Sequence, residues 1–240
     1  MNTYVPSAWM RPTAPFFMNG GAFNGRLIQQ KAPFMGIVIA LMIVQLVITY
    51  YTMEILSKNT KFQEYMKSNL WLLILLLILP FVIIVILAFV PMSRFSKLIL
   101  FTIFSLLFGL MLSAIRNRVT PELVRAAILA TVGIFIAMFI VGLVLAGLGY
   151  DLFWLGMILF VLLIILVIAG IIMLFTDPSN KALRIRAILV IVLFSIYILF
   201  DTNQIIMRDY NSDYVMAAID YYLDVVNIFV ALLQVLGENS

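Results

Sequence analysis

Two aspartates lie inside the last two apolar segments of this chain. Asp201 lies in SIYILFDTNQII, and Asp224 lies in YYLDVVNIF. A carboxylate at the centre of a membrane-spanning helix costs about 2.5–3.5 kcal/mol, so acids at that depth usually serve a function. Paired carboxylates support three kinds of chemistry: a proton-sensitive contact, a cation site of hard oxygen ligands, or the acid–base dyad of an aspartic protease.

The polar residues around Asp224 recur at helical spacing. At about 100° per residue, five of them fall within an arc of roughly 80° on one helix face. They are Asp213, Asp220, Asp224, Asn227 and Gln234. Such a face does not point toward lipid, so we expect it to contact other helices or a water-filled path.

The segment that contains Asp201 has a polar face of its own. Tyr197, Asp201, Gln204 and Arg208 follow one another at spacings of four, three and four residues. The connection to the next segment is short, so the two helices should be antiparallel neighbours. That arrangement allows Asp201 to pair with Asp224, and two such carboxyl groups would share a proton. The alternative is a polar seam that only orients the two helices.

The composition places these residues in a membrane protein. The chain is 65% hydrophobic and 11% charged, with a mean hydropathy of +1.18. A soluble domain keeps roughly a quarter of its residues charged. The net charge of +4 comes from basic residues between the apolar runs. It therefore concerns membrane topology, and no nucleic-acid partner is predicted.

The chain contains neither cysteine nor histidine. Disulfides, thiol chemistry, zinc clusters and histidine-ligated haem are therefore excluded, and no cofactor is predicted. Histidine is the side chain that most often titrates near neutral pH. Any pH response of this chain must therefore come from its carboxyl groups.

Seven apolar segments predict seven spanning helices, since about 20 apolar residues cross a bilayer. The predicted spans are residues 32–53, 68–93, 98–115, 121–150, 152–176, 187–207 and 214–236. Residues 1–31 are predicted to form a flexible tail before a membrane domain at 32–237. The last segment is the least hydrophobic, so the alternative is six spans with a re-entrant last segment. Thr120, Pro121 and Glu122 predict an N-cap, a first-turn proline and a first-turn acid.

The motifs in the last two segments resemble the Bax inhibitor-1 family, also called the transmembrane Bax inhibitor motif family. Its members typically carry an aromatic-Asp-Thr/Leu-x-x-Ile segment, here FSIYILFDTNQI at 194–205. Their last helix reads approximately Ala-Leu-x-Leu-Tyr-Leu-Asp-Ile-Ile-Asn-Leu-Phe, matched here by residues 218–229. The sequence Gly-Tyr-Asp-Leu at 149–152 is also similar, and the resemblance extends over roughly residues 120–237.

The resemblance implies an all-α bundle of seven membrane helices with a semi-polar seventh helix at its centre. Members are described as pH-sensitive calcium leak channels and as inhibitors of cell death. By similarity, Asp201 and Asp224 match a proton-sensitive latch at the cytosolic side of the pore, and Arg94 matches a basic partner of that latch. Calcium would be the permeant ion, with transient contacts to Asp201 and Asp224. The partners that the resemblance implies are the lipid bilayer and membrane proteins that regulate cell death.

Other polar residues are expected to contribute to the pore, and two positions depart from the family pattern. Gln204, Asp213, Asp220 and Asn227 are predicted to line the pore. Asp220 departs from the family, where its position is usually apolar or small. The acid that some members carry in the second helix is missing near Pro80. The implied location is a bacterial inner membrane, or the endoplasmic reticulum or Golgi of a eukaryotic or virus-infected cell.

Two other functions compete with that of a channel. One is a non-conducting membrane protein that inhibits apoptosis through its partners. The other is an intramembrane aspartic protease, which would need Gly-x-Gly before its second aspartate and Pro-Ala-Leu in a later helix. Here Tyr221, Tyr222 and Leu223 precede Asp224, and no later apolar segment follows. No enzymatic activity is therefore predicted.

Overall fold

A computed structural model describes residues 23–208, 210 and 213–237 of the chain. All secondary structure in these residues is helical, which confirms the all-α prediction. The helices are α1 (Gly25–Ser57), α2 (Thr60–Ser68), α3 (Leu70–Phe89), α4 (Arg94–Arg116), α5 (Pro121–Gly147), α6 (Phe153–Phe175), α7 (Asn180–Met207) and α8 (Tyr214–Gly237).

Six of these helices are long and apolar enough to cross a membrane: α1, α4, α5, α6, α7 and α8. The chain is therefore an integral membrane protein, as its composition predicted. Within α3, the apolar stretch Ile74–Phe89 is shorter than the usual spanning length. The count of seven spans accordingly stays a prediction.

Several helix boundaries differ from those predicted. The first helix begins at Gly25 rather than at residue 32, so the end of the predicted tail is helical. Residues 1–22, where the rest of that tail was predicted, lie outside the described residues. The short amphipathic helix α2 was not predicted, and α7 begins at Asn180 rather than at residue 187. Hydropathy locates only the apolar run, whereas these helices continue past it.

Side-chain caps explain where the helices begin. Thr120 accepts a hydrogen bond from the backbone N–H of Leu123 at 3.4 Å, with Pro121 in the first turn, which confirms the predicted N-cap. Ser179 accepts in the same way from Ala182 at 3.3 Å and starts α7. Each cap satisfies a backbone donor that the helix itself leaves free.

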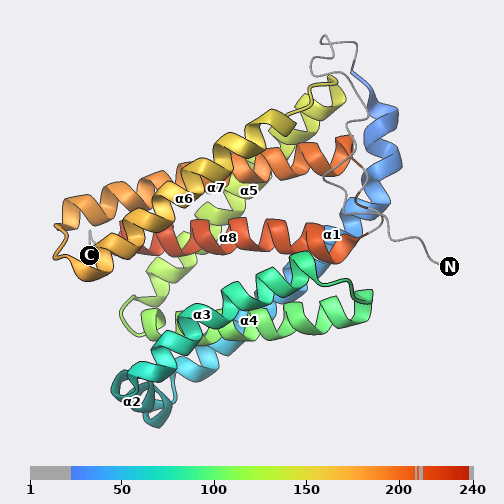
Figure 1. The fold of residues 1–240 in the computed structure, drawn as a ribbon. Helices are drawn as coiled ribbons and strands as arrows, with labels where there is room; N and C mark the ends of the chain where they lie inside the picture. Colours follow the sequence, from blue (N-terminus) through green and yellow to red (C-terminus); the bar gives the residue numbers. More distant parts are fainter. Residues whose placement is uncertain (1–22, 209, 211–212, 238–240) are drawn as a thin grey trace.

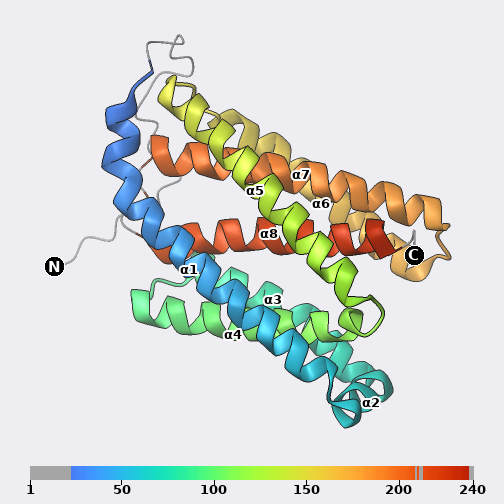
Figure 2. The ribbon, with the colours of Figure 1, turned by 180° about the vertical axis from the view of Figure 1, so that it is seen from behind.

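The last helix, α8, occupies the centre of the bundle. In Figures 1 and 2, α8 runs between α6 and α7 on one side and α3 and α4 on the other. It packs against α7, α1, α5 and α4. In the most apolar stretch of each helix, 61% of α8 is buried against 6% of α6. On the polar face of α8, Asp224 is buried and the other four residues are half-buried. The helix α6 faces outward.

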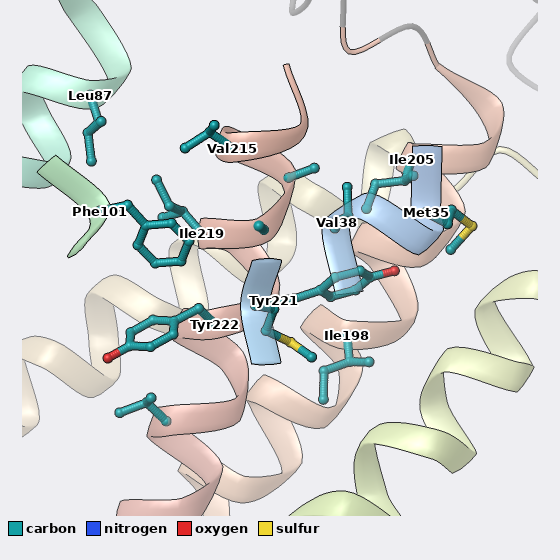
Figure 3. Close-up of a cluster of buried hydrophobic side chains, with 14 of the residues drawn as sticks. Met35, Val38, Leu87, Phe101, Ile198, Ile205, Val215, Ile219, Tyr221 and Tyr222 are labelled. Carbon is teal, nitrogen blue, oxygen red and sulfur yellow. The ribbon is translucent and has the colours of Figure 1, made fainter. Parts of the chain in front are cut away.

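Two adjacent tyrosines anchor α8 to opposite halves of the bundle. Figure 3 shows the rings of Tyr221 and Tyr222 on opposite sides of α8. The Tyr222 hydroxyl lies 2.6 Å from Oγ1 of Thr49 in α1, and its ring packs edge-on against Phe101 in α4. The Tyr221 hydroxyl lies 2.7 Å from Oγ1 of Thr202 in α7. Both tyrosines are fully buried, so these contacts fix the rotation of α8.

The Tyr222→Phe substitution should lower the free energy of unfolding by about 0.5–1.5 kcal/mol, because it removes one buried hydrogen bond and keeps the ring. Reversible unfolding in detergent micelles measures this change. The matched control is Tyr51→Phe, whose side chain is 60% exposed. An equal loss of stability in both variants would contradict the role given to the hydroxyl of Tyr222.

Candidate functional site: a pair of buried aspartates

Asp201 of α7 and Asp224 of α8 meet inside the bundle. Their side chains lie close enough to share a hydrogen bond. Asp201 is 7% exposed and Asp224 is 3% exposed. The Oδ2 atom of Asp224 is buried and has no hydrogen-bond partner among the described residues. A hydrogen bond between two carboxyl groups needs a proton on one of them, so the arrangement is built around a shared proton.

The pair lies several residues inside both helices. Asp201 precedes the end of α7 by six residues, and Asp224 follows the start of α8 by ten residues. At about 1.5 Å per residue, these positions correspond to depths of roughly 9 Å and 15 Å along the two helices. The carboxyl groups therefore lie within the two helices, away from the connection that joins α7 to α8.

The electrostatic surroundings of the pair are acidic. Asp220, one helical turn before Asp224, acts on both carboxyl groups, and neither Asp201 nor Asp224 takes part in a salt bridge within the described part of the chain. In the connection between α7 and α8, burial and the carboxylates of Asp220 and Asp201 raise the pKa of Tyr210. The Tyr210 hydroxyl therefore stays neutral and does not titrate with the pair.

Salt bridges fix the end of the bundle nearest the pair. Asp213 interacts with Lys97 of α4, and its Oδ1 also caps α8 by accepting from Met216 N–H at 3.2 Å. Arg208 interacts with Asp151, which precedes α6, at 3.1 Å. Asp213 was predicted to line the pore, and in the structure its carboxylate forms the salt bridge with Lys97. This contact could not be predicted from the sequence, because its two residues are far apart in the chain.

Gln204 and Arg94 make polar contacts with residues other than Asp201 and Asp224. Gln204 donates to Oδ1 of Asp151 at 3.3 Å and to Oδ1 of Asn203 at 3.1 Å. It therefore joins α7 to the connection between α5 and α6. The guanidinium of Arg94 lies 5.7 Å from the ring centroid of Tyr214, at the first residue of α8.

The two remaining amides of the α8 polar face belong to a different environment. Asn227 donates to the backbone oxygen of Leu223 at 2.7 Å. Together with Gln234 it lines a recess of about 130 Å³ between α6, α7 and α8. The polar face predicted from spacing thus serves the aspartate pair in its first half and this recess in its second half.

The described residues contain no group of three or more acidic, histidine or cysteine side chains arranged to hold a metal ion. Calcium ordinarily takes six to eight oxygen ligands. Transient calcium contact with Asp201 and Asp224 therefore stays a prediction about a permeating ion.

A family profile and several known proteins match the sequence of this chain. A family profile described as "Inhibitor of apoptosis-promoting Bax1" matches residues 32–240. The chain is 27% identical to Bax inhibitor 1 of Schizosaccharomyces pombe, over 98% of this chain and 87% of that protein. It is 26% identical to the BI1-like protein of Arabidopsis thaliana, over 82% of this chain and 77% of that protein.

Two shorter matches have higher identity. Protein LIFEGUARD 4 of Arabidopsis thaliana is 34% identical over 47% of this chain and 45% of its own length. An uncharacterized protein of Campylobacter jejuni is 37% identical over 49% of this chain and 54% of its own length. These two matches span only about half of each relative, and together with the longer matches they show relatives in both bacteria and eukaryotes.

Proposed function

This chain belongs to the Bax inhibitor-1 family of membrane proteins, and we propose that it is a calcium leak channel gated by protonation of the Asp201–Asp224 pair. The observation that carries the proposal is the buried hydrogen bond between these two carboxyl groups, one on the central helix and one on its neighbour. The geometry supports a contact that exists only while a proton is shared.

The direction of the pH response follows from that contact. At low pH one carboxyl group is protonated, the hydrogen bond holds α7 against α8, and the pore is closed. As the pH rises both groups ionise, and two unit charges about 4 Å apart repel by about 4 kcal/mol at an effective dielectric constant of about 20. Deprotonation therefore opens the pore.

The groups that face the Asp201–Asp224 pair also affect its pH response. Asp220 of α8 is acidic, while Tyr197 of α7, Tyr210 of the connection and Tyr221 of α8 are phenols. Repulsion from an ionised Asp220 favours the shared proton. Once the pair is open, Asp201, Asp220 and Asp224 together present three carboxylates to a passing cation.

Calcium flux into proteoliposomes tests the proposal. Vesicles with the full chain should take up calcium faster than empty vesicles, and the rate should rise as the pH is raised. The absence of flux at every pH, or a rate that falls with rising pH, would refute it.

A second candidate is a non-conducting protein that inhibits apoptosis through membrane partners. The description of the matched family favours it, since it names inhibition of cell death and not transport. In this case the aspartates would serve helix packing alone. A variant that protects cells from death without any calcium flux would favour this second function. Neither candidate is an enzyme.

A further inference from the structure

Arg186 places a positive charge in the recess between α6, α7 and α8. The side chain is half-buried, and its Nε atom is buried without a hydrogen-bond partner among the described residues. The guanidinium also lies directly against the backbone of α6, because a Cβ on Gly170 would come within 2.6 Å of its Nη2 atom. A buried N–H donor without an acceptor is costly, so this site is incomplete as it stands.

The rest of the recess combines polar groups with an apolar wall. Asn227 and Gln234 of α8 line it on the polar side, and Leu163 and Val167 of α6 line it on the other. Asn227 uses its amide for one bond within α8, and amides carry a second N–H donor. The recess can therefore offer a guanidinium and amide donors to an anion that also brings an apolar part.

The position of Arg186 matches the depth of lipid headgroups. Arg186 follows the start of α7 by six residues, which is roughly 9 Å along the helix. The 28 residues of α7 span about 42 Å, which exceeds the hydrocarbon thickness of about 30 Å, so the first turns lie in the headgroup region. Arginine side chains near helix ends extend toward that region.

The recess is reachable from the bilayer because α6 faces outward along almost its whole length. From the unpaired Nε donor of Arg186, the amide lining and the apolar wall, we infer that this recess binds a phospholipid, with its phosphate on Arg186 and an acyl chain along α6. The site lies at the opposite end of α7 from the Asp201–Asp224 pair and does not depend on the proposed channel function.

The test is thermal unfolding of the purified full chain in detergent, titrated with phosphatidylglycerol, with diacylglycerol of the same acyl chains, and with inorganic phosphate. Phosphatidylglycerol should raise the unfolding temperature, and the other two should not. In Arg186→Gln the apparent affinity for phosphatidylglycerol should fall by about fivefold, the effect typical of one basic residue at a membrane surface. The Arg186→Lys variant keeps the positive charge, so its affinity for phosphatidylglycerol should fall less.

Lys181→Gln removes a charge from the exposed start of the same helix and should bind phosphatidylglycerol as the wild type does. Unchanged affinity in Arg186→Gln, or an equal loss in Lys181→Gln, would overturn the site. If inorganic phosphate raised the unfolding temperature as much as phosphatidylglycerol does, the recess would be a site for a free anion and not for a lipid. If diacylglycerol did so, the phosphate group would not be needed for binding. Either result would overturn the proposal.

Discussion

Calcium flux through the Asp201→Asn and Asp224→Asn variants is expected to be low and nearly independent of pH. In the wild type the two carboxyl groups are joined only when a proton is shared. An asparagine amide has the same shape and donates to the remaining carboxylate without a titrating proton. The helices α7 and α8 should therefore stay together at every pH, and the rise of flux on deprotonation should disappear.

Alanine at the same positions should have the opposite effect at low pH. Asp201→Ala or Asp224→Ala removes the hydrogen bond, so flux in acid should exceed that of the wild type. If the aspartates acted only as cation ligands, both asparagine and alanine would lower the flux. Asp177→Asn is the matched control, because this acid is exposed in the connection between α6 and α7. A wild-type pH profile in both single asparagine variants would show that the pair is not the gate.

The Gly142→Ala substitution is expected to destabilise the protein by about 1–3 kcal/mol, the usual cost of overpacking. A Cβ at Gly142 of α5 would lie 2.6 Å from the backbone oxygen of Leu199 and 2.7 Å from Cβ of Thr202, both in α7. A backbone atom cannot move aside as a side chain does, so α5 and α7 must separate. Thr202 follows Asp201 directly, so the aspartate pair should be disturbed as well.

Gly133→Ala in the same helix is the control for this effect. A Cβ at Gly133 meets no atom within 4 Å, and alanine favours helix by about 1 kcal/mol over glycine. Unfolding in detergent should therefore show a lower midpoint for Gly142→Ala and an unchanged or higher midpoint for Gly133→Ala. Equal midpoints for the two variants would contradict the close approach of α5 and α7.

The contact of Asp201 with Asp224 could be predicted because the residues close to each of them in the sequence indicate where its side chain points. Each lies on a polar helix face that spacing alone reveals, and the short connection makes α7 and α8 neighbours. Helix spacing also predicted that the polar face of α8 would contact other helices or a water-filled path, and in the structure Asp224 is buried while the rest of that face is half-buried.

The surroundings of the pair could not be predicted in the same way. Gln204 shares a face with Asp201, yet its amide reaches Asp151, because the end of α5 brings that acid alongside α7. Asp213 pairs with Lys97 of α4, a contact between elements that are distant in sequence. Helix spacing describes one helix at a time, and these partners are determined by how the helices pack.

The predicted starts of α1 and α7 differ from the structure for another reason. Apolar runs mark the part of a helix that lies in lipid, whereas the helix itself starts where a cap satisfies its first backbone donors. Asn24 provides that cap for α1 and Ser179 for α7, each outside the apolar run. The polar first turns of α7 are also what carries Arg186 into the headgroup region.

One pH titration tests the gate most directly by following the proton and the ion together. Infrared spectra of the reconstituted protein report the protonated carboxyl group through its C=O band, and calcium flux is recorded in the same vesicles. We predict that the band is lost and the flux gained at the same midpoint, and that Asp201→Asn removes both changes. Flux that rises while the band persists would contradict gating by the Asp201–Asp224 pair.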